Sequence, residues 1–180
     1  MNKLRVFILI GAVSVSQLIS QNQLPIENGE METIEDGFFS QWATQATNGA
    51  NANFSITANN LIAGSTRALK SEIISLGNNN YDISASSEYN FEVVAGQKYT
   101  VSFYAKIEGA SSRQMKVIFR SEINDSFQGQ DIWITDTWQR YTHTFTVDAS
   151  GNSNKLKFWF LQEGVTYFLD EVSVIPGNYV

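Results

Sequence analysis

The sequence predicts an all-β protein, a β-sandwich with jelly-roll topology and little or no helix. Several short runs alternate apolar and polar residues with the period of a half-buried strand, and turn-forming Gly, Asn and Ser residues separate these runs. No segment of helical length carries apolar residues at the i, i+3, i+4 spacing of an amphipathic helix. Short strands at regular spacing are typical of sandwiches and barrels.

The expected strands follow one another through most of the chain. They cover residues 24–31, 54–57, 68–76, 89–94, 99–107, 114–123, 138–147, 155–161 and 165–175. Residues 109–112 are expected to form a turn, and residues 32–53 and 124–136 are expected to be mostly loop. The last two runs form a predicted hairpin around Gln162, Glu163 and Gly164, and this hairpin carries the main functional clues.

Alternation in the final run places an acid on the inward face. Asp170 has the same parity as Phe168, Val172 and Val174. An ionised carboxylate facing a core is unfavourable unless it is paired, hydrogen-bonded or bound to a metal, so Asp170 needs a partner from elsewhere in the chain. In the preceding run Trp159 faces outward, beside Lys157.

The composition limits the number of domains and the class of ligand. The chain has 180 residues, 43% of them hydrophobic, which is enough for one domain with a substantial core. A net charge of -6 and a pI near 4.7 argue against a nucleic-acid partner and suit a neutral ligand. The absence of cysteine excludes disulfides and a thiol nucleophile.

The N-terminus has the pattern of a secretory leader. Lys3 and Arg5 precede the apolar run 6–15, and small residues follow it. We expect a signal peptide over residues 1–20, cleaved between about residues 16 and 22, and a sandwich over residues 23–176. The mature protein would then be secreted, periplasmic or at the cell surface, with no membrane segment. The alternative is a retained membrane anchor.

Outward-facing aromatic and polar side chains are the candidates for sugar binding, because pyranose rings stack on aromatic faces and polar groups bind their hydroxyls. The candidates are Tyr104, Lys106, Arg120, Lys157 and Trp159 by alternation, with Trp133 and Gln128 from the predicted loop 124–136. Trp42 and Trp138 are expected in the core. His143 is expected to be buried and neutral between Tyr141 and Phe145.

Hydrolase machinery is hard to find in the sequence. It has no Gly-x-Ser-x-Gly elbow, no His-rich metal pattern and no Glu-x-Asp-x-x-Glu run of acids along one strand. The acid pairs Glu122 with Asp125 and Glu35 with Asp36 fall in or beside expected loops. A non-catalytic binding domain is therefore favoured. The alternative is a structural or adhesive sandwich that docks on a protein partner through a flat apolar patch around Trp159.

Four short segments in order resemble the carbohydrate-binding modules of the family 4, 9, 16 and 22 group. They are LPIENGEME at 24–32, GQKYTVSFYAK at 96–106, WQRYTHTFTV at 138–147 and YFLDEVSV at 167–174, with Met31 where the family usually has an aromatic residue. The resemblance implies a β-sandwich that binds a polysaccharide or oligosaccharide, with a glycoside hydrolase acting alongside. It also implies a structural calcium held by Glu32 and Asp170, with Asn28 as a further ligand and main-chain carbonyls completing the shell.

Overall fold

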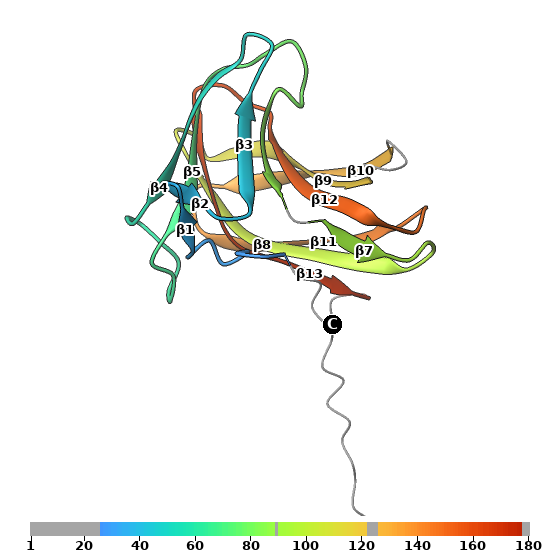
Figure 1. The fold of residues 1–180 in the computed structure, drawn as a ribbon. Coiled ribbons are helices and arrows are strands. Elements are labelled where there is room, and N and C mark those ends of the chain that lie inside the picture. Colours follow the sequence, from blue (N-terminus) through green and yellow to red (C-terminus); the bar gives the residue numbers. More distant parts are fainter. Residues whose placement is uncertain (1–25, 89, 122–125, 178–180) are drawn as a thin grey trace, which may run out of the picture.

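The computed structural model describes residues 26–88, 90–121 and 126–177, and most of these residues form two large antiparallel sheets packed face to face (Figure 1). Consecutive strands cross repeatedly from one sheet to the other, which is jelly-roll topology. The predicted all-β sandwich is therefore confirmed. Within the described ranges no helix is long and apolar enough to cross a membrane. The predicted leader lies outside the described residues.

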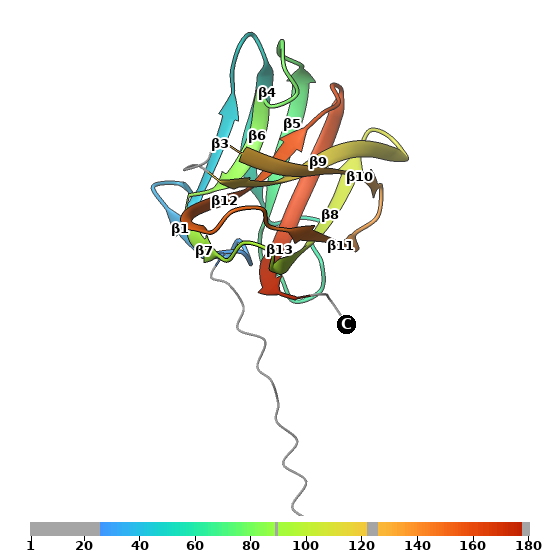
Figure 2. The same cartoon turned by 90° about the vertical axis from the view of Figure 1, so that its right-hand side faces the viewer.

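The first sheet, called here the front sheet, has six strands and faces the viewer in Figure 2. Its order is β10 (Ser126–Thr135), β9 (Ser112–Ser121), β12 (Gly151–Phe160), β6 (Ile83–Ser87) and β3 (Trp42–Ala46), with β7 (Phe91–Val93) also paired to β12. The second, the back sheet, has five strands. Its order is β11 (Gln139–Thr146), β8 (Lys98–Glu108), β13 (Val165–Pro176), β5 (Ala68–Ser75) and β4 (Asn51–Thr57).

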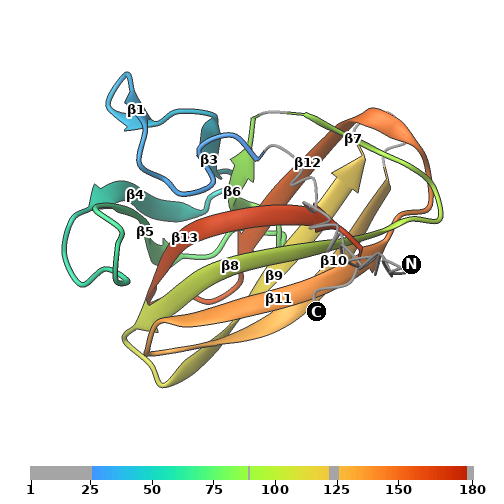
Figure 3. The ribbon, with the colours of Figure 1, turned by 90° about the horizontal axis from the view of Figure 1, so that it is seen from below.

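A small third sheet pairs β1 (Ile34–Glu35) with β2 (Phe38–Phe39). Viewed from below, β8, β11 and β13 lie in one layer and β9, β10 and β12 in the other (Figure 3). The residues 109–111 carry the chain from β8 to β9, so the predicted turn is a crossing between sheets rather than a hairpin within one sheet.

Alternating residues of the two sheets meet in an aromatic core. The ring of Phe158 in β12 makes an edge contact with Phe103 in β8, with centroids 5.1 Å apart, and lies 6.2 Å from the ring of Trp42. Edge contacts of this kind are favourable beyond simple burial. The predicted inward residues of β8, β9 and β12 are buried in this core, which confirms the predicted alternation of inward and outward residues in those strands.

Four segments differ from the prediction. Ile83–Ser87 forms strand β6, where no strand is expected. Residues 126–135 form strand β10 rather than a loop, because they pair along their whole length with β9. The predicted loop 32–53 contains β1, β2, β3 and the start of β4. The expected strand 24–31 is absent from its described part: residues 27–30 form turns, with positive φ at Asn28 and Met31.

A β-bulge changes the face on which Asp170 lies. The pairing of β13 with β8 shifts register between Asp170 and Ser173, and Glu171 has a positive φ of 51°. Before the bulge Tyr167 and Leu169 enter the core, whereas Val172 and Val174 do so after it. The prediction that Asp170 shares the core face is therefore wrong, because a bulge inserts one residue and reverses the parity. Asp170 is buried on the outer face of the back sheet.

The first described segment, residues 26–32, packs tightly against this bulge, alongside β13 in Figure 3. The amide of Val172 donates to the carbonyl of Gly29 at 2.7 Å. A Cβ on Gly29 would lie 2.0 Å from the carbonyl oxygen of Val172, which is far inside van der Waals contact. Glycine is therefore required here for close backbone approach rather than for an unusual φ.

We expect Gly29→Ala to destabilise the fold by about 3 kcal/mol, since backbone must move to admit the methyl group. Chemical denaturation monitored by tryptophan fluorescence measures this change. Gly37→Ala is the matched control: Gly37 has a φ of 84°, and a Cβ there would meet no atom within 4 Å, so the substitution should cost only about 1 kcal/mol. Equal effects of the two substitutions would refute the close-approach explanation.

Candidate functional site

A hollow on the outer face of the front sheet, called here the groove, is the first candidate site. Its volume is about 540 Å³. It is lined by Gln45, Asn78, Asn79, Asn80, Tyr81, Ser84, Arg120, Lys157 and Trp159. Aromatic faces beside amides and hydroxyls are the surroundings that a sugar ring requires.

Strand register brings the groove residues together. Trp159 of β12 pairs with Ser84 of β6, and Ser84 pairs with Gln45 of β3, so these side chains form one row across the sheet. Lys157 is two positions away on β12 and shares the face of Trp159. Arg120 reaches the groove from β9. The predicted candidates Trp159, Lys157 and Arg120 are thus brought to one site.

Tyr81 and Trp159 form the aromatic part of the groove. Their ring centroids are 5.8 Å apart and their planes are inclined by 59°. Tyr81 is 48% exposed, so its ring is open to a ligand. Inclined aromatic rings can contact a sugar ring and its neighbour from different sides, while the adjacent Asn side chains offer donors and acceptors for hydroxyls.

Asp82 holds the loop that carries the groove residues 78–81. This buried carboxylate accepts hydrogen bonds from the Asn79 amide at 2.7 Å and from Asn48 Nδ2 at 2.6 Å. Burial opposes ionisation, but these bonds, with one from Thr47, outweigh it and lower the pKa of Asp82 below its ordinary value. Asp82 is therefore ionised at neutral pH and fixes the loop on the turn at 47–49.

We expect Asp82→Asn to lower the thermal midpoint by several degrees, because an amide would place donors against the donors of Asn48 and Asn79. Hydrogen exchange at residues 78–81 should become faster while exchange in β8 is unchanged. Asp136→Asn serves as the control, since Asp136 is an exposed acid after β10. Unchanged exchange in the loop of the Asp82 variant would contradict the positioning role.

Two further candidates lie away from the groove. Trp133 is on β10, on the same face of the front sheet as Trp159, and is 60% exposed, but it does not line the groove. Trp133 pairs with Gln114 of β9, and Trp159 pairs with Lys116 of the same strand. The two indoles therefore flank β9 at positions two residues apart. Gln128 donates to the carbonyl of Thr146 at 2.6 Å and to Asp148 at 2.9 Å, so its amide ties β10 to the 146–148 segment.

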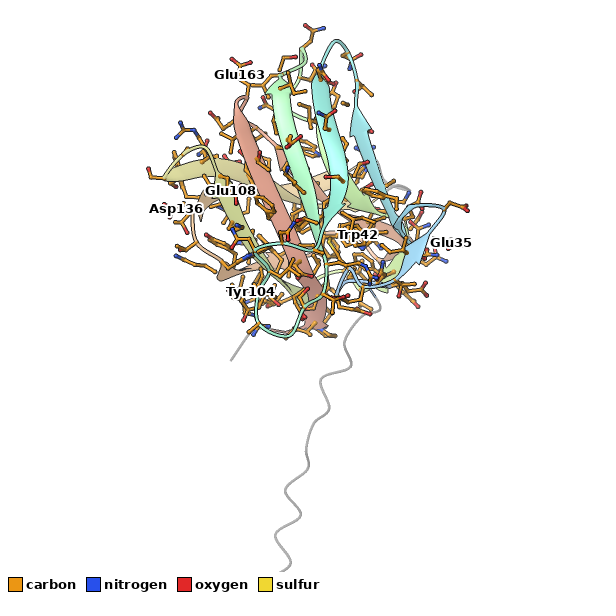
Figure 4. The ribbon with its side chains drawn as sticks, turned by 90° about the vertical axis from the view of Figure 1, so that its left-hand side faces the viewer. Glu35, Trp42, Tyr104, Glu108, Asp136 and Glu163 are labelled. Carbon is orange, nitrogen blue, oxygen red and sulfur yellow. The ribbon has the colours of Figure 1, made fainter. Side chains whose placement is uncertain are left out.

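Tyr104 and Lys106 lie on the opposite side of the molecule, on the back sheet seen in Figure 4, where Tyr104 is labelled. Lys106 is only 2% exposed; its ammonium pairs with Glu108 at 2.9 Å and lies 4.4 Å from the ring of Phe168. The structure therefore does not bring these two residues to the groove. Sequence alternation marks a side chain as outward but does not tell which sheet carries it.

The remaining aromatic predictions have mixed outcomes. Trp42 is buried as predicted, and its indole donates to the carbonyl of Asn28 at 2.9 Å. Trp138 is half-buried outside the core, where its indole donates to the carbonyl of Asn60 at 2.6 Å. His143 is half-buried against Phe145, and burial lowers its pKa, which keeps the imidazole neutral at neutral pH.

Sequence reasoning missed much of the groove. The missed residues are Gln45, Asn78, Asn79, Asn80, Tyr81 and Ser84. An available signal was the three-residue asparagine run followed by tyrosine, since amides and an aromatic ring together are typical of sugar sites. The same run is equally typical of a polar turn. Only the pairing of β6 with β12 places it beside Trp159.

A second candidate site is the acid pair of Glu32 and Asp170, in which the charge of Glu32 lies close enough to raise the pKa of Asp170. Glu32 Oε1 accepts hydrogen bonds from the amide of Thr66 at 2.6 Å and from the hydroxyl of Ser65 at 3.0 Å. Arg67 lies 3.4 Å from Glu32 Oε2. Burial opposes ionisation of Glu32, but the bonds from Thr66, Ser65 and Arg67 prevail and lower its pKa.

Asp170 has the opposite electrostatics. Burial raises the pKa of Asp170 to about 6; the nearby Ser65 hydroxyl and the Glu171 amide oppose this shift, and the negative charges of Glu171 and Glu32 add to it. Its Oδ1 accepts the Glu171 amide at 2.8 Å, whereas its buried Oδ2 accepts no hydrogen bond from the described residues. A buried carboxylate oxygen of this kind calls for a cation.

The side chain of Asn28 is engaged elsewhere. Its Nδ2 donates to the carbonyls of Thr33 and Ser40, each at 2.8 Å, and its Oδ1 accepts the Thr33 amide at 2.8 Å. Across the described parts of the chain, no three His, Cys, Asp or Glu side chains gather as a metal site. A cation at the acid pair would therefore need main-chain carbonyls, as calcium sites commonly have.

Comparisons with solved structures agree with this architecture. A structure titled "CBM4 structure and function" matches with a TM-score of 0.64 and 21% identity, covering 85% of this chain and all (100%) of the other. The CBM22-1 xylan-binding domain from Paenibacillus barcinonensis Xyn10C matches with a TM-score of 0.56 and 18% identity over 81% and 92% of the two chains. An arabinose-bound α-L-arabinofuranosidase matches with a TM-score of 0.70 and 14% identity, over 87% of this chain and 27% of the enzyme.

The sequence comparison with curated proteins gives no significant match. The family profile CBM_4_9, described as a carbohydrate binding domain, matches residues 28–163. This span includes most of the sandwich and every described residue that lines the groove. On these grounds the chain belongs to this family of carbohydrate binding domains.

Proposed function

We propose that this protein binds a polysaccharide or oligosaccharide in the groove of the front sheet. The observation that carries the proposal is the Tyr81–Trp159 ring pair beside the amides of residues 78–80, in a hollow of about 540 Å³. Two stacking contacts contribute about 1 kcal/mol each, and the free-energy cost of ordering the ligand offsets part of this gain. We therefore expect weak binding, with Kd values of about micromolar to millimolar.

A structural calcium ion is the second part of the proposal. The donor set fits calcium, since Glu32 and Asp170 supply two carboxylates and Asp170 Oδ2 is a buried oxygen without a hydrogen bond among the described residues. When bound, the ion would neutralise the acid pair and join the first segment to β13. Asn28 remains only a predicted ligand, because its side chain already makes three hydrogen bonds.

We further propose that the protein acts outside the cytoplasm, after removal of the predicted leader, and that it binds glycan without cleaving it. A glycoside hydrolase acting alongside would supply any cleavage. Incubating the purified protein with a polysaccharide panel and measuring new reducing ends tests the non-catalytic assignment. Release of reducing ends above a heat-inactivated control would overturn it.

Affinity electrophoresis through gels that contain glucans, xylans, mannans or algal polysaccharides tests glycan binding itself. We expect retardation in at least one gel, relative to a protein of similar size that does not bind sugars. Retardation that Trp159→Ala abolishes would support the groove as the site. Lack of retardation in every gel would refute the proposal.

A second candidate function is docking on a protein partner without any glycan. The observation that favours it is Trp133, which is 60% exposed on the outer face of edge strand β10 and lies outside the groove. An exposed indole on an edge strand is a common element of protein interfaces. Complete absence of glycan binding would leave this function as the better explanation of the front sheet.

A further inference from the structure

A second hollow, called here the rear hollow, lies on the outer face of the back sheet, on the opposite side of the sandwich from the groove. Its volume is about 570 Å³, close to the 540 Å³ of the groove, so it has room for a ligand of similar size. Tyr104, labelled in Figure 4, lines it from β8. The other lining residues are Leu61, Ile62, Ala63, Trp138 and Glu171.

The residues 58–67, called here the strap, connect β4 to β5 and supply the aliphatic wall of the rear hollow. Both ends of the strap are held by hydrogen bonds. Near its start, the carbonyl of Asn60 accepts the indole N–H of Trp138 at 2.6 Å. Near its end, the amide of Thr66 donates to Glu32 at 2.6 Å. A wall that is fixed before a ligand arrives lowers the ordering cost of binding.

Two aromatic side chains line the rear hollow. The Trp138 indole is held by Asn60 and makes an edge contact with Phe168, with ring centroids 6.3 Å apart. The ammonium of Lys106 lies 5.8 Å from the Trp138 ring, a cation–π contact that further fixes this ring. Tyr104 is half-buried, and its hydroxyl makes no hydrogen bond with another described residue, so it can donate to a ligand or accept from one.

The β-bulge in β13 adds a carboxylate to the rear hollow. In a regular strand the residue after Asp170 would point to the other face of the sheet, but at the bulge Glu171 has a positive φ of 51° and is exposed beside Tyr104. A non-glycine residue in this conformation is strained, and such strain is frequent at binding sites. Glu171 and Tyr104 also line an adjoining hollow of about 350 Å³, which gives room for more than one sugar unit.

The chemistry of the rear hollow selects a class of ligand. Aromatic rings and an aliphatic wall suit the C–H faces of a sugar, while the Tyr104 hydroxyl and the Glu171 carboxylate suit its hydroxyl groups. A carboxylate only accepts hydrogen bonds, so Glu171 favours hydroxyls over the acceptor groups of a uronate or sulfate. A peptide that adds a strand requires a free sheet edge, whereas β8 and β13 beneath the hollow are paired on both sides.

We propose that the rear hollow is a second saccharide site, which binds a neutral oligosaccharide by contact with Trp138 and Tyr104 and by hydrogen bonds to Glu171. The rear hollow and the groove lie on opposite faces of the sandwich, so they cannot contact the same stretch of a polysaccharide. One molecule with both sites filled would bridge two polysaccharide chains. The inference does not depend on the groove, and each site can fail without the other.

Nuclear magnetic resonance of the ¹⁵N-labelled protein tests the inference, because each of the 4 tryptophan indoles gives its own N–H signal. The probes are xylohexaose, cellohexaose, mannohexaose and laminarihexaose, added to the parent and to Trp159→Ala. We expect at least one probe to cause saturable shifts at the Trp138 indole and at the amides of residues 61–63 and 104, with a Kd of about millimolar. These shifts should persist in Trp159→Ala, which lacks the larger ring of the groove.

Substitutions at Tyr104 identify the site. Tyr104→Ala should weaken binding at the rear hollow at least fivefold, whereas Tyr104→Phe keeps the ring and should weaken it no more than about twofold. Ile74→Ala is the matched control and should leave binding unchanged. It removes a 51% exposed apolar side chain from β5, on the same face of the back sheet but outside the rear hollow. The thermal midpoint of each variant establishes that it is folded.

The outcomes separate this inference from the proposed function. Shifts confined to the groove residues, or rear shifts that Tyr104→Ala leaves unchanged, would overturn the second site while glycan binding in the groove stands. Rear shifts without any shift at the Trp159 indole would support the second site and count against the groove. No saturable shift with any probe would overturn both sites.

Discussion

Calcium added to the metal-free protein is expected to raise its thermal midpoint by roughly 10 °C. A ligand present at about 1,000 times its Kd stabilises the folded state by about 4 kcal/mol, and each kcal/mol shifts the midpoint of a domain of this size by about 2–4 °C. The physical reason is the acid pair: a cation would remove the unfavourable burial of Asp170 next to Glu32. Differential scanning calorimetry after chelation, with calcium or magnesium added back, measures the shift.

Asp170→Asn separates the calcium explanation from ordinary packing. An amide of the same shape removes the buried charge, so the metal-free variant should be at least as stable as the metal-free parent at neutral pH. The same variant should lose the response to calcium. Glu171→Gln is the matched control, since Glu171 is exposed next to Asp170 and removing its charge should leave the response largely unchanged. A full calcium shift in the Asp170 variant would exclude this site.

The pH dependence of the metal-free protein has a defined sign. The pKa of Asp170 is raised to about 6 from an ordinary 3.8, so its contribution to folding stability is complete below pH 3.8 and is lost as the pH rises through 6. The loss should be about 2 kcal/mol, after allowance for solvent screening. Glu32 acts oppositely: its lowered pKa gives stability that is present above its ordinary value and is lost as the pH falls through the lowered one.

Comparison of the parent with Asp170→Asn isolates the Asp170 contribution, because Glu32 is common to both. Denaturant titrations at pH 4, 5, 6 and 7 without metal should show the parent losing stability relative to the variant between pH 4 and 7. The calcium shift should grow over the same interval, since protons and calcium compete for the carboxylate. A stability difference that is independent of pH would contradict the raised pKa.

Alternation in the sequence was sufficient to predict the central strands. Strands β8, β9 and β12 carry apolar residues at every second position through most of their length, and their inward residues form the core as expected. These strands are also paired on both sides, so neighbouring chains reinforce the geometry that each sequence favours. The outward position of Trp159 and Lys157 follows from the same pattern, which explains why part of the groove could be predicted.

Local patterns failed where long-range contacts decide the structure. Strand β10 lacks a clear apolar period, and it is a strand because β9 pairs with it. The bulge after Asp170 reverses the parity of β13, and Val172 beside this bulge hydrogen-bonds to Gly29, 143 residues earlier in the chain. The pairing of Glu32 with Asp170 stays a prediction, which rested on the buried parity assigned to Asp170 and on resemblance. In the structure the charge of Glu32 raises the pKa of Asp170, although the bulge places Asp170 on the other face of the sheet from the one predicted.

The groove could be predicted only in part, because its residues come from separate elements. Tyr81 and the asparagines reach Trp159 through the loop fixed by Asp82, and nothing in the local sequence indicates that β6 pairs with β12. Tyr104 and Arg120 have the same outward parity on consecutive strands, yet they lie on opposite faces because β8 and β9 belong to different sheets. Assignment of strands to sheets was the missing information.

Trp159→Ala should weaken binding of the tightest polysaccharide at least tenfold, which corresponds to about 1.4 kcal/mol or more. Trp159 supplies the larger aromatic face of the groove, and its removal also leaves Tyr81 without its ring partner. Tyr81→Ala should weaken binding about three- to fivefold, since the smaller ring contributes less contact area. Calorimetry or quantitative affinity electrophoresis measures both changes.

A double-mutant cycle tests whether the two rings act together. Because the rings lie 5.8 Å apart and would contact one ligand, the combined loss should differ from the sum of the single losses by about 0.5–1 kcal/mol. Trp133→Ala is the matched control, since it removes an equally large and more exposed indole from the same sheet face outside the groove. It should change affinity less than twofold. If Trp133→Ala weakens binding as much as Trp159→Ala, the ligand extends across β9 to the edge strand and the groove alone does not define the site.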